Sequence, residues 1–442
     1  MSQSTTTMRL PTRAGVPLVA AFDGGRLTSD GGLPWLAEAD AALGLCTTLA
    51  QCIPDWRRGP VRHSLETLMR QRVYQIACGY EDQDDADTLR HDPLLKLVCG
   101  RLPDSGAPLA SQPTLSRLEN QVSRHTAERL ARALVDLYIA ARGRHGPPDR
   151  IRLDFDGTDD PAHGQQEGVA YHGYYDQHMY HPLLVFDGGT GQLITAVLRP
   201  GNAHGSRFAV LVLRRLVRRL RQHWPGVVVE LRADSGFAIP RLYAWCEAHA
   251  VPYTVGLVPN PALERLAAPL LREAYAQSAA EAGAKVRLVA ETPYQAGSWS
   301  QARRVVYKAE VLAKGPNTRF VVTTHTAEPR TVYDAYVARG QAENFIKDYK
   351  NALAADRLSD HRFWANQFRL LLHAAAYWLL DTLRHWLVTT EAARFQFDTL
   401  RLRLLKVGGR VWERLGWVRL ALATSHPAQP HWLHLAARPG RS

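Results

Sequence analysis

The chain has 442 residues, of which 46% are hydrophobic and 22% are charged, and its formal net charge is +12 at pH 7. This length allows about two to four domains, and the excess of Lys and Arg makes a polyanionic partner plausible, because neutralised phosphates release counterions. The five cysteines form no Cys-x-x-Cys pair, so neither a structural zinc site nor a disulfide framework is expected.

Residues from about 30 to 145 have a helical pattern, with Pro-, Gly- and Asp-rich turns between the segments. Two of these segments, Ser64–Gly79 and Thr114–Arg142, have the length of whole helices. The run His145-Gly-Pro-Pro-Asp149 predicts a domain boundary, because its Gly and Pro residues end regular structure. We therefore expect an N-terminal helical region over residues 1–148.

Strand and helix patterns alternate after this boundary. Ile151–Phe155 predicts a strand, and two apolar runs around Gly188-Gly189 predict a strand pair. Further helix and strand patterns follow, in the order helix, strand, helix, strand: Ser206–Trp224, Val227–Ala233, Pro240–Ala250 and Pro252–Leu257. This order predicts an α/β core over residues 149–260, with a mixed central sheet and helices on its faces.

The rhythm changes again after residue 260. Residues 261–330 predict a β-rich insertion, and helices beginning near Val332 and Arg362 predict the second part of the core over residues 331–392. In the basic C-terminal region, residues 393–442, the alternating run Leu400–Val407 and the run Trp417–Leu422 predict a two-stranded ribbon in a mixed helical and β tail.

Acidic residues follow two of the predicted strands. Asp154 and Asp156 are two residues apart, so on a strand they share one face, and Asp234 ends the strand that begins at Val227. Carboxylates at strand ends commonly form sites for hard cations, because Mg²⁺ prefers oxygen ligands. Taken alone, Asp154 and Asp156 could equally cap a turn, and Asp234 could cap the helix after it.

A third acidic position lies in a predicted helix over residues 336–350. At about 100° per residue, Tyr336, Arg339, Glu343 and Lys350 fall within a stripe of roughly 60°. The stripe lies beside an apolar face, at the rim of the expected core. The alternative is a solvated helix face, on which Glu343 pairs with Lys347.

The spacing Y-x2-R-x3-E-x6-K resembles the YREK signature of the DDE transposases of bacterial insertion sequences. The chain also resembles one branch, the DDE transposase group 1, over nearly its whole length. The motifs that carry this resemblance are Leu27-Thr-Ser-Asp30-Gly-Gly, Gln71-Arg-Val-Tyr, Ser111-Gln-Pro-Thr-Leu-Ser-Arg117, Asp156-Gly-Thr, His163-Gly-Gln and Asp234-Ser-Gly-Phe.

The resemblance implies an RNase H-like core with a β insert before the helix that carries the catalytic Glu. It implies a catalytic and metal-binding triad of Asp156, Asp234 and Glu343, with Asp154 as a rival for the first position. Two Mg²⁺ or Mn²⁺ ions are expected per site. DNA contacts are expected from Tyr336, Arg339, Lys347 and Lys350, whereas His163 could line the cleft or be structural.

The implied function is metal-dependent cleavage and transfer of DNA strands by a cut-and-paste route through hairpinned ends. The implied partners are double-stranded DNA, as terminal inverted repeats and target, and a second copy of the chain. A structure-specific nuclease on the same fold and a transposase-derived DNA-binding protein remain alternatives. No signal peptide and no membrane span are expected, so a cytoplasmic, nucleoid-associated location is predicted.

Overall fold

The computed structural model of the chain describes residues 7–280 and 284–438 and divides into two compact units. The first unit combines Met1–Gln121 with Ala375–Ser442, and the second is Val122–Ala374. The first unit is thus assembled from both ends of the chain, and the finer division into five regions stays a prediction. Within residues 7–280 and 284–438, no helix is both long and apolar enough to cross a membrane.

The N-terminal part of the first unit is mainly helical, as predicted. Its longer helices are α1 (Leu33–Leu43), α2 (Leu45–Gln51), α3 (Leu65–Ala77) and α6 (Gln112–Asn120). The single helix predicted over Thr114–Arg142 is wrong, because the chain leaves α6 after Asn120 and begins α7 (Arg124–Arg142) in the second unit. The Ser123 side chain accepts a hydrogen bond from the Thr126 amide and caps this new helix.

The C-terminal part of the first unit packs its backbone directly on the N-terminal part. The Gly31 amide donates to the Val407 carbonyl at 2.8 Å, and the Gly32 amide donates to the Leu405 carbonyl at 3.1 Å. A Cβ at Gly31 would lie 2.5 Å from the Val407 oxygen, so only glycine allows this approach. Lys406 adds an ion pair with Asp30 at 2.7 Å.

The ribbon predicted near the C-terminus is displaced along the chain. Residues 397–405 are helical, as α14 (Phe397–Leu400) and a π-turn, and the ribbon is formed by β15 (Gly409–Arg414) and β16 (Trp417–Leu422). Leu400 and Leu404 are buried, whereas Leu402 is 66% exposed. The apolar spacing that decides the structure here is therefore i, i+4, which suits a helix, and not the alternation that suggested a strand.

An eight-stranded mixed sheet forms the centre of the second unit. Its strands, in spatial order, are β12 (Val286–Tyr294), β13 (Arg303–Leu312), β14 (Gly315–Thr323), β11 (Tyr253–Leu257), β10 (Val228–Ala233), β4 (Arg150–Gly157), β8 (Leu183–Asp187) and β9 (Leu193–Val197). Strands β11, β10 and β4 are parallel, and the other pairs are antiparallel. The expected α/β core with a mixed central sheet is confirmed, and the β insert extends this sheet.

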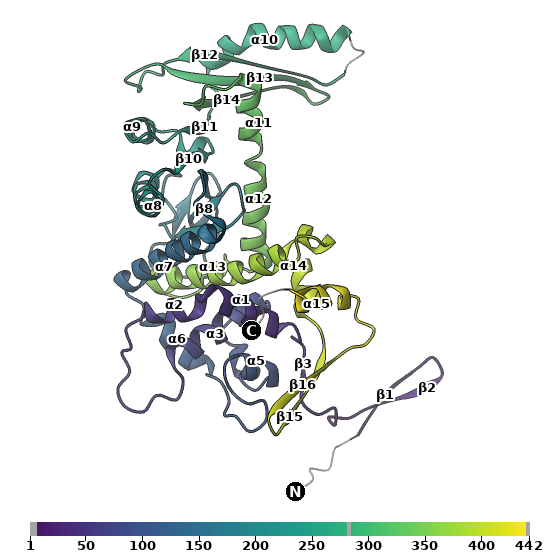
Figure 1. The fold of residues 1–442 in the computed structure, drawn as a ribbon. Helices are drawn as coiled ribbons and strands as arrows, with labels where there is room; N and C mark the ends of the chain where they lie inside the picture. Colours follow the sequence, from purple (N-terminus) through teal and green to yellow (C-terminus); the bar gives the residue numbers. More distant parts are fainter. Residues whose placement is uncertain (1–6, 281–283, 439–442) are drawn as a thin grey trace. The chain divides into compact units, whose positions relative to one another are not determined.

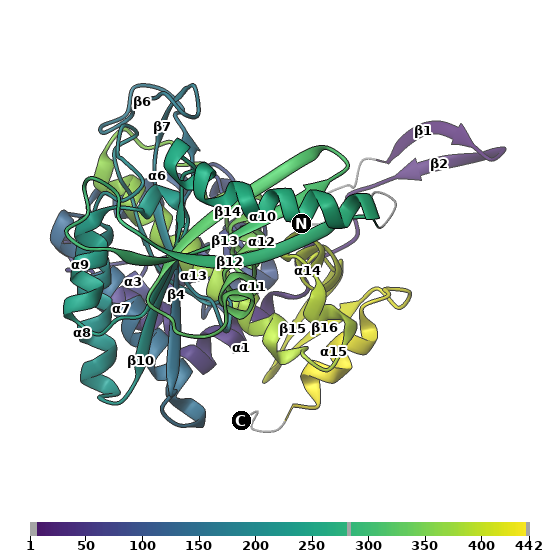
Figure 2. The same cartoon turned by 90° about the horizontal axis from the view of Figure 1, so that it is seen from above.

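Helices cover both faces of this sheet. The helices α8 (Ala209–His223) and α9 (Pro240–Ala248) lie on one side, and α11 (Pro329–Val337) lies on the other (Figures 1 and 2). The helix α10 (Pro261–Ala280) packs on the strands of the insert. Because side chains alternate along β4, Leu153 and Phe155 face away from α11, whereas Asp154 and Asp156 share the α11 face.

Candidate active site

Asp156 and Asp234 lie at the carboxyl ends of two neighbouring parallel strands. Phe155 of β4 is in register with Ala233 of β10, and the residue that follows each of them is an aspartate. Asp234 also caps the short turn after β10, since its Oδ1 accepts a hydrogen bond from the Gly236 amide at 2.8 Å. Two carboxylates therefore meet at one edge of the sheet, as the strand-end pattern predicts.

The environment of Asp156 disfavours its charged form. Burial is the main cause that raises the pKa of Asp156 to about 7, and the charge of Asp234 adds to it. Arg339 opposes this shift through an ion pair, with its Nη1 2.7 Å from Asp156 Oδ2. The single positive charge of Arg339 therefore does not fully compensate the negative charges of Asp156 and Asp234.

Tyr336 and Arg339 approach the aspartates from the end of α11. The Tyr336 hydroxyl lies over Gly256 of β11, where a Cβ would be 2.6 Å from it. The same Cβ would be 3.0 Å from the amide nitrogen of Ser235, which follows Asp234. The absence of a side chain at Gly256 therefore allows the tyrosine to reach the edge that carries Asp234.

The single helix predicted over residues 336–350 is interrupted. Helix α11 ends at Val337, α12 runs over Gly340–Lys347, and a π-turn follows over Asp348–Ala352. The amides of Arg339, Gln341 and Ala342 bond to carbonyls three residues earlier, as in a 3₁₀ turn. At 120° instead of 100° per residue, three such steps rotate the following residues by about 60°.

This rotation separates the members of the predicted stripe. Glu343 and Lys347 are exposed on α12. Lys350 lies in the π-turn, with its Nζ 2.7 Å from Asp159 Oδ1 and 3.9 Å from Asp356 Oδ2. Among the residues that the structure describes, no three His, Cys, Asp or Glu side chains gather closely enough to hold a metal ion.

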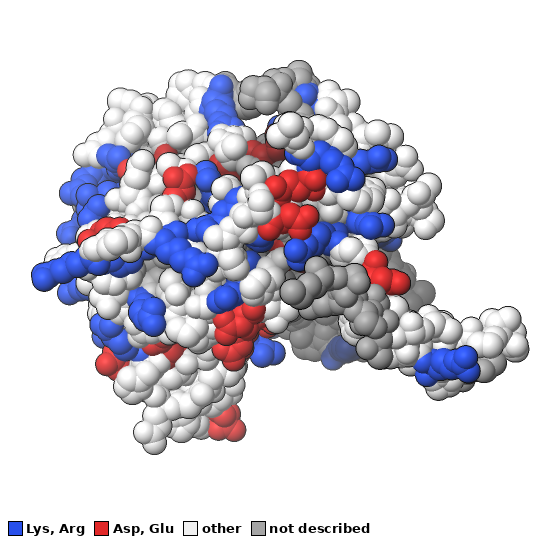
Figure 3. All heavy atoms as spheres, turned by 90° about the horizontal axis from the view of Figure 1, so that it is seen from below, with Lys and Arg blue, Asp and Glu red and all other residues white. Residues whose placement is uncertain are grey.

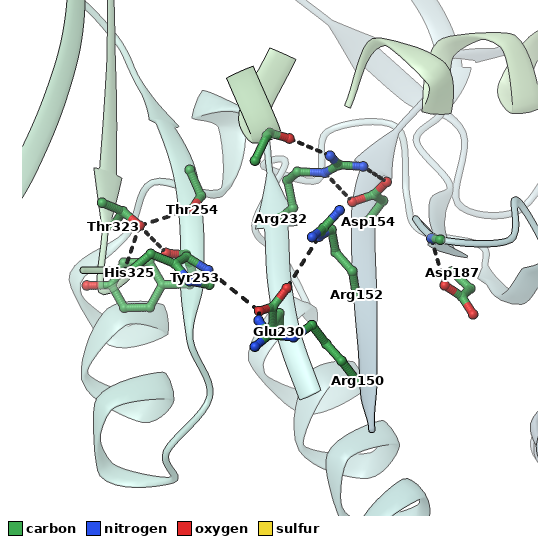
Figure 4. Close-up of polar contacts among 12 residues, drawn as sticks. Arg150, Arg152, Asp154, Asp187, Glu230, Arg232, Tyr253, Thr254, Thr323 and His325 are labelled. Atoms are coloured by element: carbon green, nitrogen blue, oxygen red, sulfur yellow. Dashed lines mark hydrogen bonds and ion pairs between the residues drawn. The ribbon is translucent and has the colours of Figure 1, made fainter. Parts of the chain in front are cut away.

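Asp154 and His163 have other partners. Asp154 is buried and accepts two hydrogen bonds from Arg232, whose Nε lies 2.7 Å from its Oδ1 and whose Nη2 lies 2.5 Å from its Oδ2 (Figure 4). His163 is exposed, and its Nε2 lies 3.2 Å from the Asp356 carbonyl oxygen. Within residues 7–280 and 284–438, neither side chain forms a hydrogen bond or ion pair with Asp156 or Asp234, although Asp154 lies on the same face of β4 as Asp156.

Arg232 helps to position the elements of the candidate site, and the sequence patterns did not single it out. Besides its bonds to Asp154, it donates through Nη1 to the Ala335 carbonyl oxygen at 2.6 Å. It therefore links three elements: β4 two residues before Asp156, β10 two residues before Asp234, and α11 one residue before Tyr336. The available signal was an arginine in a strand whose other residues, apart from Glu230, are apolar, because a buried arginine is expected to have a partner.

A second acidic group, Asp159, Asp160 and Asp356, surrounds Lys350 and was also missed. Asp159 and Asp160 follow the Asp-Gly-Thr motif directly, so the run Asp156-Gly-Thr-Asp-Asp160 was the available signal. Burial is the main cause that raises the pKa of Asp160, and Asp356 adds to it. The ion pair with Asp159 holds Lys350 beside this group.

The donor set fits a divalent cation in part. Asp156 and Asp234 supply hard oxygen ligands of like charge at one sheet edge, and a cation between them would relieve the repulsion that helps to raise the pKa of Asp156. Glu343 does not lie with them in this arrangement of α12. The aspartate pair is therefore the part of the predicted set that the fold assembles.

The raised pKa of Asp156 predicts a pH dependence of stability. Unfolding lowers this pKa from about 7 to its ordinary value of 3.8. Between these values the folded state binds more protons, so the group lowers the unfolding free energy as the pH rises. The Asp156→Asn variant lacks this titration and should gain stability relative to the wild type over that window, by up to about 4 kcal/mol. Urea denaturation in chelator at several pH values measures the difference, and a difference independent of pH would contradict the assignment.

Comparisons with known proteins complete this description. The sequence model of a family described as "Transposase DDE domain group 1" matches residues 10–440. A solved structure of the piggyBac transposase synaptic complex with hairpin DNA aligns with a TM-score of 0.45 and 12% sequence identity. That alignment covers 90% of this chain and 81% of the other chain. A search of curated proteins finds no match.

Proposed function

This chain belongs to the transposase DDE domain group 1 family and is a DDE transposase, and we propose that it cuts and rejoins the ends of an insertion sequence with Asp156, Asp234 and Glu343 as its catalytic carboxylates. The observation that carries the proposal is the pair of aspartates at the ends of two parallel strands, with Arg339 beside them. The engagement of Asp154 by Arg232 favours Asp156 as the first catalytic carboxylate.

Under this proposal Asp156, Asp234 and Glu343 would together hold two Mg²⁺ or Mn²⁺ ions. When bound, such ions lower the pKa of an attacking hydroxyl and neutralise the leaving oxygen. Glu343 joins the aspartates when the 3₁₀ turn at residues 338–342 relaxes to an α-helix and rotates α12 back by about 60°. DNA that binds against α12 would favour this rearrangement, by interacting with one of two conformations.

The basic side chains of this segment hold the DNA in the proposal. Arg339 suits a phosphate because its guanidinium forms a planar fork, and Lys347 and Lys350 act as point charges. Tyr336 contacts the end of the same DNA strand. Elsewhere, Lys and Arg side chains are interspersed with Asp and Glu on the face drawn in Figure 3. We infer that specific placement of the DNA depends on the residues around the aspartates.

The proposed reaction is cut-and-paste transposition through hairpinned ends, in a complex of two copies of the chain on the terminal inverted repeats. Water attacks one strand and frees a 3′-hydroxyl, which attacks the opposite strand and closes a hairpin. A second water opens the hairpin and frees the 3′-hydroxyl again, and this hydroxyl then attacks the target, so no covalent protein nucleophile is needed. His163, which contacts the backbone at Asp356, is assigned to holding that loop.

A metal-dependent nuclease on the same fold would share the carboxylates but require no end recognition. The deciding experiment incubates the full chain and Mg²⁺ with duplexes that carry the inverted repeats flanking its gene, and with duplexes in which the repeats are scrambled. Transposition predicts cleavage at the repeat boundary, a hairpin product on denaturing gels and joining to a plasmid. Equal cleavage of both duplexes without joining would show a nuclease instead.

A further inference from the structure

A tyrosine at the tip of a small hairpin stands out in the second unit. The strands β6 (Ala170–His172) and β7 (Gln177–Tyr180) form this hairpin (Figure 2). The short strand β5 (Asp160–Pro161) pairs with β7 as a third strand. Tyr174, in the turn between β6 and β7, is 86% exposed. Burial of apolar surface therefore does not explain an aromatic residue at this position.

The turn holds Tyr174 in a defined place. The amides of Tyr175 and Asp176 both donate to the His172 carbonyl, at 3.1 and 2.9 Å, and the Tyr171 hydroxyl donates to the Asp176 carboxylate. Asp176 adopts a left-handed conformation with φ of 52°, which an aspartate tolerates better than most residues. A turn fixed by three hydrogen bonds displays its exposed ring with little loss of entropy on binding.

Aromatic contacts connect this tip to the end of β4. The rings of Tyr174 and Tyr175 are 5.0 Å apart, and the Tyr175 ring is 6.0 Å from the ring of His181. His181 in turn lies against Gly157, where a Cβ would be 2.7 Å from its Nε2. Gly157 directly follows Asp156, so the tip reaches the first aspartate through two ring contacts.

The hairpin is also tied to the acidic side of the site. The Gln177 side chain donates to Asp159 Oδ2 at 3.2 Å, and Asp159 is the partner of Lys350. Burial, together with the charges of Asp159 and Asp156, raises the pKa of Tyr175 to about 12. These contacts place the base of the turn next to the carboxylates, with Tyr174 directed outward from it.

We propose that Tyr174 stacks on an unpaired nucleobase beside the phosphate at which the DNA is cut. This inference rests on the proposed function, because that function brings a DNA strand to Asp156. An exposed aromatic ring suits a base, since every base offers a flat face whatever its sequence. Tyr175 contacts the Tyr174 ring at right angles, with an interplanar angle of 85°, and so helps to hold this ring in place.

The test compares two DNA probes in chelator, so that no strand is cut. One probe is a fully paired duplex with a 2-aminopurine, and the other carries the same 2-aminopurine unpaired in a one-nucleotide bulge. The wild type is expected to bind the bulged probe more tightly, roughly 5- to 100-fold, and to quench its fluorescence on stacking. Tyr174→Ala should lose this preference and the quenching, whereas Tyr174→Phe should keep both.

Two variants separate stacking from other effects. Tyr174→Leu keeps apolar surface but not the flat ring, so it should bind the bulged probe like Tyr174→Ala. Tyr275→Ala removes a 45% exposed tyrosine from α10 and should behave as the wild type. Unchanged preference and quenching in Tyr174→Ala would overturn the inference, and so would equal losses in Tyr275→Ala. Failure of the transposition assay with intact quenching would refute the proposed reaction but leave this stacking contact standing.

Discussion

Asp156→Asn and Asp234→Asn are each expected to lower the rate of strand cleavage by at least about 10³-fold. Each change removes one negative charge from the pair at the sheet edge while it keeps the shape of the side chain. The stabilisation that a bound metal gives to a phosphoryl-transfer transition state amounts to several kcal/mol, and each 1.36 kcal/mol corresponds to tenfold in rate. Single-turnover cleavage of a radiolabelled end duplex in Mg²⁺ measures the rate.

A matched control distinguishes loss of chemistry from loss of structure. Asp334→Asn changes an exposed carboxylate on α11, which pairs with Arg287 at the surface, and should cleave within about twofold of the wild type. Calorimetric titration with Mn²⁺ should show weaker binding to Asp156→Asn and Asp234→Asn but not to Asp334→Asn. If either active-site variant cuts as fast as the wild type, the assigned aspartates are wrong. Glu343→Gln tests the third carboxylate separately, since a solvated glutamate would leave the rate unchanged.

Arg232→Met should destabilise the second unit by about 3–5 kcal/mol. The guanidinium and the Asp154 carboxylate are each 4% exposed or less and form a two-pronged ion pair. Removal of one partner leaves the other charge buried without compensation, which costs more than the pair contributes. The same change also frees the Ala335 carbonyl, and α11 loses a direct bond to the sheet. Urea denaturation followed by tryptophan fluorescence measures the shift.

Two further variants decide whether burial of the pair causes this loss. Arg330→Met removes a 79% exposed arginine from α11, the helix that Arg232 contacts, and should change the unfolding free energy by less than about 0.5 kcal/mol. The double variant Asp154→Leu with Arg232→Met has no stranded charge and should recover much of the stability. A double variant no more stable than Arg232→Met would show that packing, not charge, is the cause.

The sequence predicted the aspartate pair because strand signals are local. The predicted strands end next to Asp156 and Asp234, and the alternation of side chains along a strand indicates the face on which a residue lies. The ion pair of Asp154 could not be predicted from local patterns, because its partner Arg232 is 78 positions away along the chain. Only the register of β4 with β10 makes them neighbours, and register is a property of the assembled sheet.

The predicted stripe from Tyr336 to Lys350 assumed a uniform rotation per residue. Hydrogen bonds of the 3₁₀ type tighten the chain at residues 338–342, and a π-turn widens it at Asp348–Ala352. Neither departure leaves a signal in apolar periodicity, because both depend on how the flanking helices pack. Spacing therefore identified which residues belong to the signature but not which of them share a direction.

The joint between residues 30–32 and 404–407 has a consequence for synthesis of the protein. The ribosome makes the N-terminal helices of the first unit long before Leu405 and Val407, whose carbonyls the Gly31 and Gly32 amides require. Until those last residues emerge, the N-terminal segment lacks part of its packing and remains open to chaperones and proteases. A nascent chain or a truncated product that ends before residue 400 would therefore contain a complete aspartate pair in its second unit while its first unit is unfinished.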